Sequence, residues 1–262
     1  MVAAADATTA TSFGMPTKMA IDTTNHRLFL SDASNCRVLV FNLNTDNLTP
    51  FDATADFVLG HTTFTEGCPA PIPAANAHNL SSPQGLAYSN NQLFVADNGY
   101  NRVLVFNTSN LSNGMDASFV LGQTGMTGEG TACTATGMNS PTNLVIDTTN
   151  NKVLVADTGN DRVLIFDIAT LASGMAASNF IGQPGATTCT ANTTQQKMND
   201  PYGLAFIGTN LWVVDGGNNR VLMFNVATYN NNLSAANVLG QSVFTTSTIG
   251  TTSSTLSGPI TI

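Results

Sequence analysis

The sequence predicts an all-β protein built from one repeated four-stranded unit, and three observations lead to this prediction. A segment of fifteen residues recurs four times: LFLSDASNCRVLVFN at 28–42, LFVADNGYNRVLVFN at 93–107, VLVADTGNDRVLIFD at 153–167 and LWVVDGGNNRVLMFN at 211–225. A proline and a short apolar segment precede each copy, and an apolar segment ending in glycine follows it. The prolines recur with a period of about 60 residues, which is typical of repeat architectures.

Each unit is predicted to contain four short strands. The recurring segment has two apolar runs around a polar turn, which is the pattern of a β-hairpin. Upstream segments such as GLAYS and NLVID, and downstream segments such as FVLGQ and NVLGQ, add one strand each. A small sheet that is apolar on both faces is stable only against similar sheets, so the units should pack around an axis as the blades of a β-propeller.

The predicted boundaries are a flexible N-terminal segment at 1–12 and a propeller at 13–262. Its repeats are expected at about 13–80, 81–138, 139–198 and 199–256, with the start of a fifth at 257–262. Both ends look like parts of a repeat, which allows three hypotheses: a longer array, a four-bladed disc with a spare tail, or a C-terminal strand that is added to a neighbouring molecule.

The repeated residues resemble the NHL repeat. The resemblance rests on Pro-x-Gly-Leu-Ala, an apolar pair, and then Ala-Asp-x-Gly-x-Asn-Arg-Val-Leu-x-Phe, and it covers nearly the whole chain from Phe13 onward. The long period closed by Val-Leu-Gly-Gln is similar to repeats of large bacterial and archaeal extracellular proteins. NHL propellers usually have six blades, whereas this chain has four complete repeats, so the resemblance leaves the number of blades open.

One aspartate and one arginine recur in every unit, five positions apart. They are Asp32 and Arg37, Asp97 and Arg102, Asp157 and Arg162, and Asp215 and Arg220. We expect the aspartate to cap the turn between the second and third strands, and the arginine to pair with it or to reach the adjacent blade. Gly99, Gly159 and Gly217 should supply positive φ. The first unit has Ser34 and Cys36 instead of Gly and Asn or Asp, so its turn should differ. Because the pair occurs once per blade, architecture is favoured over a catalytic ring.

The connections after each fourth strand are too regular in length to be random insertions. Each has an apolar residue three positions before its proline, and the N-terminus has one in the matching place: Phe13, Leu80, Met138, Met198 and Leu256. We interpret these residues as anchors. The connections and the Asp/Arg turns should emerge on the same face of a propeller, so one loop-rich face is the predicted binding surface. The alternative is that the connections only thicken the disc.

The four cysteines are predicted to gather on that face, with Cys68, Cys133 and Cys189 in connections and Cys36 in a turn. Two disulfides are favoured over a metal site, because the sequence has no C-x-x-C spacing and no Cys/His cluster. Three pairings are possible, of which we favour Cys36 with Cys68 and Cys133 with Cys189. Free thiols in a reducing cytosol are the alternative.

A catalytic, metal or cofactor site is not predicted. The histidines lie in unrelated places, at His26, His61 and His78. Propeller enzymes such as lactonases place their ligands on the innermost strands, but these strands offer only Lys18, Asp22 and Asp147 here, with no His or Glu. A lactonase-like hydrolase or lyase with a channel site is therefore kept only as an alternative.

Charge is scarce, at 9% of residues against about 25% in a typical soluble domain. With a net charge of −8, neither nucleic acid nor an anionic membrane is an expected partner. No apolar run is long enough to insert in a membrane, and no signal peptide is visible, although the composition favours an extracellular or cell-surface protein. Six sequons permit glycosylation, about as many as chance would give: Asn47, Asn79, Asn107, Asn110, Asn192 and Asn232.

The leading functional hypothesis is a non-enzymatic extracellular propeller that binds a protein or glycan partner through its loop-rich face. The alternatives are a subunit of a self-assembling surface fibre or layer, with self-association through the C-terminal strand, and the channel enzyme described above. Because half of the basic residues belong to one repeated turn, contacts should depend on hydrogen bonds, shape and strand pairing, with weak salt dependence.

Overall fold

The computed structural model describes residues 8–50 and 52–262, and these residues form four antiparallel sheets of four strands with no α-helix. The strands are β1 Pro16–Asp22, β2 Arg27–Asp32, β3 Arg37–Asn42, β4 Phe57–Leu59, β5 Pro83–Ser89, β6 Gln92–Asp97, β7 Arg102–Asn107, β8 Phe119–Leu121, β9 Pro141–Asp147, β10 Lys152–Asp157, β11 Arg162–Asp167, β12 Asn179–Ile181, β13 Pro201–Ile207, β14 Asn210–Asp215, β15 Arg220–Asn225 and β16 Asn237–Leu239. Short 3₁₀ turns are η1 Ala33–Asn35, η2 Asn98–Tyr100, η3 Thr108–Asn110, η4 Thr158–Asn160, η5 Ile168–Thr170 and η6 Gly216–Asn218.

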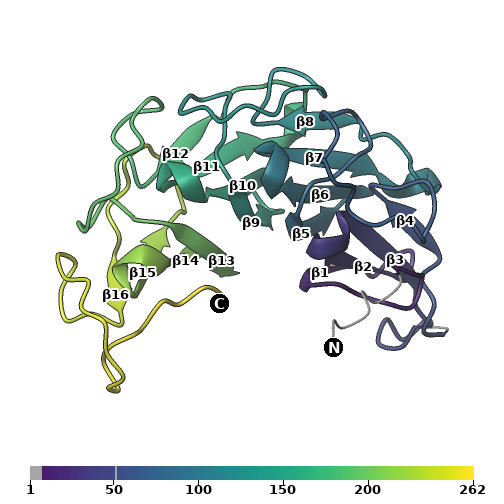
Figure 1. Cartoon of the computed structure of the whole chain (residues 1–262). Coiled ribbons are helices and arrows are strands. Elements are labelled where there is room, and N and C mark those ends of the chain that lie inside the picture. The colour runs from purple at the N-terminus through teal and green to yellow at the C-terminus, as the bar shows by residue number, and fades with distance from the viewer. Residues whose placement is uncertain (1–7, 51) are drawn as a thin grey trace.

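The sheets are the blades of a β-propeller, as the sequence predicts. Each sheet keeps chain order, so blade 1 is β1–β4, blade 2 is β5–β8, blade 3 is β9–β12 and blade 4 is β13–β16. The blades follow one another around an arc with β1, β5, β9 and β13 innermost, and each innermost strand contacts the next (Figure 1). Blades 1 and 4 are at the two ends of the arc and do not pack against each other as consecutive blades do (Figure 1).

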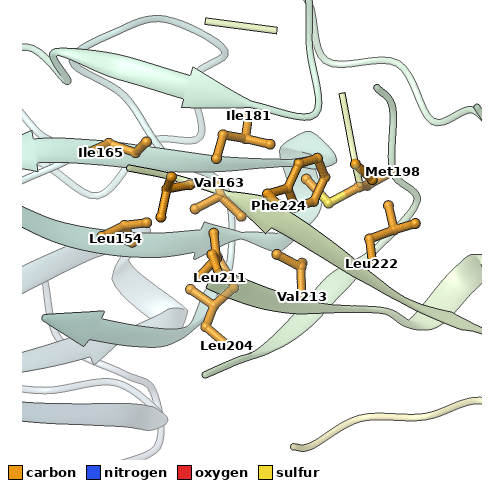
Figure 2. Close-up of a cluster of buried hydrophobic side chains, with 13 residues drawn as sticks. Leu154, Val163, Ile165, Ile181, Met198, Leu204, Leu211, Val213, Leu222 and Phe224 are labelled. Carbon is orange, nitrogen blue, oxygen red and sulfur yellow. The ribbon is translucent and has the colours of Figure 1, made fainter. Parts of the chain in front are cut away.

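The hydrophobic core lies between the blades, because the strands are apolar on both faces. Between blades 3 and 4, Leu154 and Ile165 lie opposite Leu211, Leu222 and Phe224 (Figure 2). Similar clusters join blades 1 and 2 and blades 2 and 3. A fully buried aliphatic or aromatic side chain contributes about 1.5–3 kcal/mol, so each blade is stabilised mainly by its neighbours.

The described part of the N-terminal segment is attached to blade 1. Residues 1–7 of the segment predicted to be flexible lie outside the described residues. Further on, Arg37 donates to the carbonyl oxygens of Thr9 and Ser12 at 3.0 and 2.7 Å, and the Ala10 carbonyl accepts from the Ala55 N–H at 3.0 Å. These contacts place residues 9–12 against the blade.

Candidate functional site

The recurring Asp and Arg side chains form a buried ion pair in every blade. The Arg Nε to Asp Oδ2 distances are 2.9 Å for Asp32–Arg37, 2.8 Å for Asp97–Arg102, 2.7 Å for Asp157–Arg162 and 2.6 Å for Asp215–Arg220. All eight side chains are 0% exposed. A buried charge is tolerated only when its hydrogen-bonding groups are satisfied, so the remaining N–H groups of each guanidinium show what the pair does.

Each arginine ties two connections to its own blade. In blade 2, Arg102 Nη1 donates to the carbonyl of Met126 in the departing connection at 2.5 Å, and Nη2 donates to that of Asn79 in the arriving connection at 2.8 Å. In the other blades, the departing carbonyls are those of Phe64, Ala186 and Phe244, and the arriving ones are those of Thr9, Ser12, Thr134, Gly137, Thr194 and Lys197. The arginines therefore organise the loop-rich face.

The aspartates hold the arriving connection and do not cap the turn, which corrects the sequence-based expectation. Asp97 Oδ1 accepts from the Ser81 N–H at 2.7 Å, and none of the four aspartates makes a side-chain cap hydrogen bond to its 3₁₀ turn. The equivalent donors are the N–H groups of Gly14, Met15, Asn139 and Asn199. Burial raises the pKa of Asp97 to about 6, against the lowering effects of Arg102 and of the Ser81 N–H.

The predicted role of the turn glycines is also wrong. Positive φ occurs at Cys36, Asn101, Asp161 and Asn219, with values of 52–55°, and Gly99, Gly159 and Gly217 are not among the positive-φ residues. Glycine is needed for close approach: a Cβ on Gly99 would lie 2.2 Å from Ser81 Oγ and 2.8 Å from Ser81 Cβ. A side chain at this position would collide with the arriving connection.

Blade 1 has the same contact with the two residue types exchanged. Ser34 stands at the position of Gly99, and the arriving residue is Gly14 where blade 2 has Ser81; the Cβ that Gly14 lacks would lie 2.8 Å from Ser34 Cβ. The backbone turn itself does not differ as predicted, because Cys36 has φ 53° and ψ 41° and Asn101 has φ 54° and ψ 44°. A glycine on either side of the contact is sufficient.

This exchange predicts a rescue. Gly99→Ser should lower the free energy of unfolding by about 1–3 kcal/mol, because the new side chain overfills the contact with Ser81. Adding Ser81→Gly should restore at least half of the loss, since the pair would then match Gly14 and Ser34 of blade 1. Urea unfolding of the two single variants and the double variant measures this coupling. Additive losses in the double variant would contradict it.

The residue at positive φ fixes the start of the next blade. Asn101 Oδ1 accepts from the Ser140 N–H at 2.8 Å, and Asp161 Oδ1 accepts from the Asp200 N–H at 3.0 Å. In blade 1 this position is Cys36, which forms a disulfide with Cys68 of the departing connection instead. A covalent link thus stands where the other blades use a side-chain hydrogen bond.

The closing glutamines and the anchors hold the departing connections. Gln123 Nε2 donates to the carbonyls of Asn101 and Gly130 at 2.9 and 2.8 Å, and Gln183 and Gln241 make the equivalent pairs of bonds. The anchors Leu80, Met138 and Met198 are 0–3% exposed, whereas Phe13 is 43% exposed. Each of the three lies against the glycine that closes the preceding blade, at Gly60, Gly122 and Gly182.

A second disulfide joins two successive connections. It links Cys133, between blades 2 and 3, to Cys189, between blades 3 and 4. With Cys36–Cys68, it accounts for all four cysteines in the pairing favoured from the sequence. Arginines, glutamines and disulfides together give the loop-rich face a fixed shape. Its side chains surround a hollow of about 400 Å³ lined by Ile72, Pro73, Tyr100 and Glu129 among others.

The predicted histidines do not form a ligand set. His26 contacts Asn47, His61 contacts the Asn35 carbonyl and His78 contacts Asp116. His61 and His78 both line one hollow of about 200 Å³, and His26 is not part of its lining. No group of three or more His, Cys, Asp or Glu among the described residues could hold a metal ion. Asp22 and Asp147 accept hydrogen bonds within the turns that follow their strands. Burial alone would raise their pKa values, but hydrogen bonds, including those from Asn25 to Asp22 and from Tyr229 to Asp147, lower them.

The central opening contains a cleft of about 530 Å³ between the innermost strands. Its lining includes Lys18, Gln84, Asn143 and Tyr202, and no carboxylate or imidazole from the described part of the chain. Of the sequons, Asn107, Asn110, Asn192 and Asn232 are exposed and Asn47 is half-buried. Asn79 is 8% exposed and its Nδ2 donates to the Ala74 carbonyl and to Tyr100, so the folded chain does not offer this sequon for modification.

Comparison with known proteins agrees with this geometry. Residues 80–106, which contain the blade 2 hairpin, match the family model of the NHL repeat. No curated protein matches the chain. A chain in the crystal structure of a nidogen/laminin complex is similar in structure, with a TM-score of 0.50, 13% sequence identity, and coverage of 86% of this chain and 68% of that chain. At this identity the similarity concerns the fold.

The fold and the ties between its connections define a β-propeller. Blade 2 contains an NHL repeat, and blades 1, 3 and 4 reproduce the turn of that segment in register, in agreement with the resemblance stated from the sequence. No helix in the described residues has the length and apolar character needed to span a membrane.

Proposed function

We propose that the chain is a non-enzymatic extracellular binding module whose loop-rich face contacts a protein partner. The observation that carries this proposal is the fixed shape of that face. Each connection is tied to the blades by a buried arginine, a closing side chain or a disulfide. Connecting loops are usually the most mobile segments of a protein, so such ties indicate a surface that is kept in one conformation. A preorganised surface loses little conformational entropy on binding. The two disulfides favour an oxidising compartment.

The chemistry of this face favours neutral contacts. Ile72 is 51% exposed and lines the hollow, and Thr62, Thr63 and Thr65 of the same connection are exposed. A glycan partner would use the same hydroxyl and amide groups and is the alternative ligand class. The central cleft supports an enzyme less well, because its lining offers no carboxylate or imidazole for proton transfer.

Two aliphatic residues on opposite faces test the proposed surface. Ile72→Asp alters the loop-rich face, and Leu48→Asp is the matched control, because Leu48 is 82% exposed in the β3–β4 loop at the other end of the blade. The purified chain is applied to an array that carries secreted proteins of the source organism beside defined glycans. We expect protein binding that Ile72→Asp weakens at least about tenfold, or about 1.4 kcal/mol, and that Leu48→Asp leaves unchanged.

Salt provides an independent measurement. Because the loop-rich face has few basic residues, the dissociation constant should change less than about threefold between 50 and 500 mM NaCl. A steep salt dependence, or equal effects of the two variants, would contradict the assignment. Binding to glycans alone would replace the protein partner with a carbohydrate.

A second role has its own support. Apolar side chains are exposed at both ends of the arc, including Met19 on blade 1 and Leu239 on blade 4, at 61% and 51% exposure. Such faces favour a subunit of a self-assembling surface fibre or layer.

A further inference from the structure

The two ends of the arc present complementary faces of the kind that pair inside the molecule. We call the side of a blade that packs on the preceding blade its leading face, and the other side its trailing face. Between blades 3 and 4, Leu154 and Ile165 belong to the trailing face of blade 3, and Leu204, Leu211 and Phe224 to the leading face of blade 4 (Figure 2). The same positions pair between blades 1 and 2 and between blades 2 and 3. One interface is thus repeated three times.

The leading face of blade 1 is open along its innermost strand β1, while Leu30, Leu39 and Phe41 further out on the same blade are buried at 0–9% exposure. Met19 is 61% exposed, whereas the residues at its position in blades 2, 3 and 4, Leu86, Leu144 and Leu204, are 1–2% exposed. Ile21 on the same strand is 47% exposed. Next to them is a hollow of about 600 Å³ lined by Phe13, Pro16, Met19 and Leu30 among others.

The trailing face of blade 4 is open at its outermost strand, although Val214 and Val221 on the same face are buried. Leu239 is 51% exposed, whereas the equivalent Leu59, Leu121 and Ile181 are 0% exposed. Trp212 stands where blades 1, 2 and 3 have the fully buried Phe29, Phe94 and Leu154, and it is only half-buried. Its indole Nε1–H has no hydrogen-bond partner among the described residues.

The C-terminal residues show what this trailing face accepts. A Cβ on Gly203 of β13 would lie 3.1 Å from Thr261 Cα, just as one on Gly85 of β5 would lie 2.7 Å from Asn143 Cα of the next blade. The Gly258 N–H donates to Asn219 Oδ1 at 2.8 Å, the bond that fixes the start of β9 and of β13. Residues 259–262 therefore lie where the innermost strand of a following blade begins. They leave Leu239, on the outermost strand, uncovered.

We propose that the occupant of this trailing face is blade 1 of a second copy. Its β1 starts with Pro16 as the C-terminal segment starts with Pro259, so β1 would replace residues 259–262 and bring Met19 onto the face. This contact deepens the self-assembly role proposed above. It is head-to-tail, so it closes into a ring if the rotation permits and otherwise extends into a filament. A ring of two copies would have eight blades, which is within the usual range of propellers.

The decisive experiment breaks one face in each of two variants. Met19→Asp places a charge on the leading face of blade 1, and Leu239→Asp places one on the trailing face of blade 4, so that each variant can no longer use that face for pairing. Both side chains are exposed, so the fold should persist. Light scattering should show concentration-dependent association of the native chain and a 27.3 kDa monomer for each variant alone. An equimolar mixture keeps one intact pair of faces, so it should form a dimer of twice that mass. Ile72→Asp is the matched control and should associate like the native chain.

Two further measurements separate this contact from other modes of association. Trp212 is the only tryptophan, so its emission should shift to shorter wavelength in the mixture as the trailing face is covered. Deleting residues 259–262 should lower the concentration needed for association, because the segment competes with β1. A monomeric native chain, a monomeric mixture, or loss of association on deletion would overturn the proposal; the last result would point to exchange of the C-terminal segment instead. Binding through the loop-rich face is tested by Ile72 and does not depend on these outcomes.

Discussion

Arg102→Ala should lower the free energy of unfolding by about 3–5 kcal/mol, the usual cost of leaving a buried charge without its partner. The substitution leaves Asp97, which is 0% exposed, with no counter-charge, and it also removes the donors to the carbonyls of Asn79 and Met126. Two connections lose their tie to blade 2 at once. Urea unfolding followed by circular dichroism measures the loss.

Lys152→Ala is the matched control for a surface ion pair. Lys152 Nζ and Asp167 Oδ2 are 2.7 Å apart, close to the 2.8 Å of the Arg102–Asp97 pair, but the two side chains are 17% and 40% exposed. Solvent screening makes such a pair worth less than about 1 kcal/mol. A comparable loss of stability in both variants would show that the buried Asp–Arg pairs contribute no more to stability than an exposed ion pair.

The loss in Arg102→Ala should depend on pH with a definite sign. Burial raises the pKa of Asp97 to about 6 while Arg102 opposes it, so removing the guanidinium should raise this pKa further. A carboxyl with a higher pKa in the folded than in the unfolded state binds a proton on folding and gains stability as the pH falls through the folded pKa. The variant should therefore be closer in stability to the native chain at pH 5 than at pH 8.

The blade pattern was predictable because strand periodicity and the repeated hairpin are local features of the sequence. The positions of Leu93, Val95 and Val103, which are buried in blade 2, are occupied by apolar residues in all four complete repeats. The roles within the turn were not. The sequence places Asp97 beside Gly99 and Asn101, which suggests a cap and a positive-φ glycine. The acceptor and the close contact come from Ser81, which lies outside the hairpin, in the arriving connection.

One signal for this contact was present in the sequence. Ser34 replaces the turn glycine only in blade 1, where the second residue before the proline is Gly14. Such paired substitution indicates contact between two positions that are far apart in the chain. The uncovered end faces could not be predicted in the same way, because Met19 and Leu239 fit the same apolar pattern as their buried equivalents and only the arrangement of the blades exposes them.

Replacing Cys133 and Cys189 together by alanine should lower the free energy of unfolding by about 3–4 kcal/mol. The two cysteines are 56 residues apart, and the loop they close contains all four strands of blade 3. Without the link the unfolded chain gains the conformational entropy of that loop, which grows with the logarithm of its length. Urea unfolding under non-reducing conditions measures the change.

The pair Cys36 and Cys68 is the comparison. Its separation of 32 residues predicts an entropic contribution smaller by only about 0.5 kcal/mol. Cys36 also occupies the position where Asn101 and Asp161 hold the next blade by a hydrogen bond. Replacing Cys36 by asparagine and Cys68 by alanine should therefore recover about 1 kcal/mol relative to the double alanine variant. No recovery would mean that this disulfide acts only through loop entropy and does not substitute for the missing hydrogen bond.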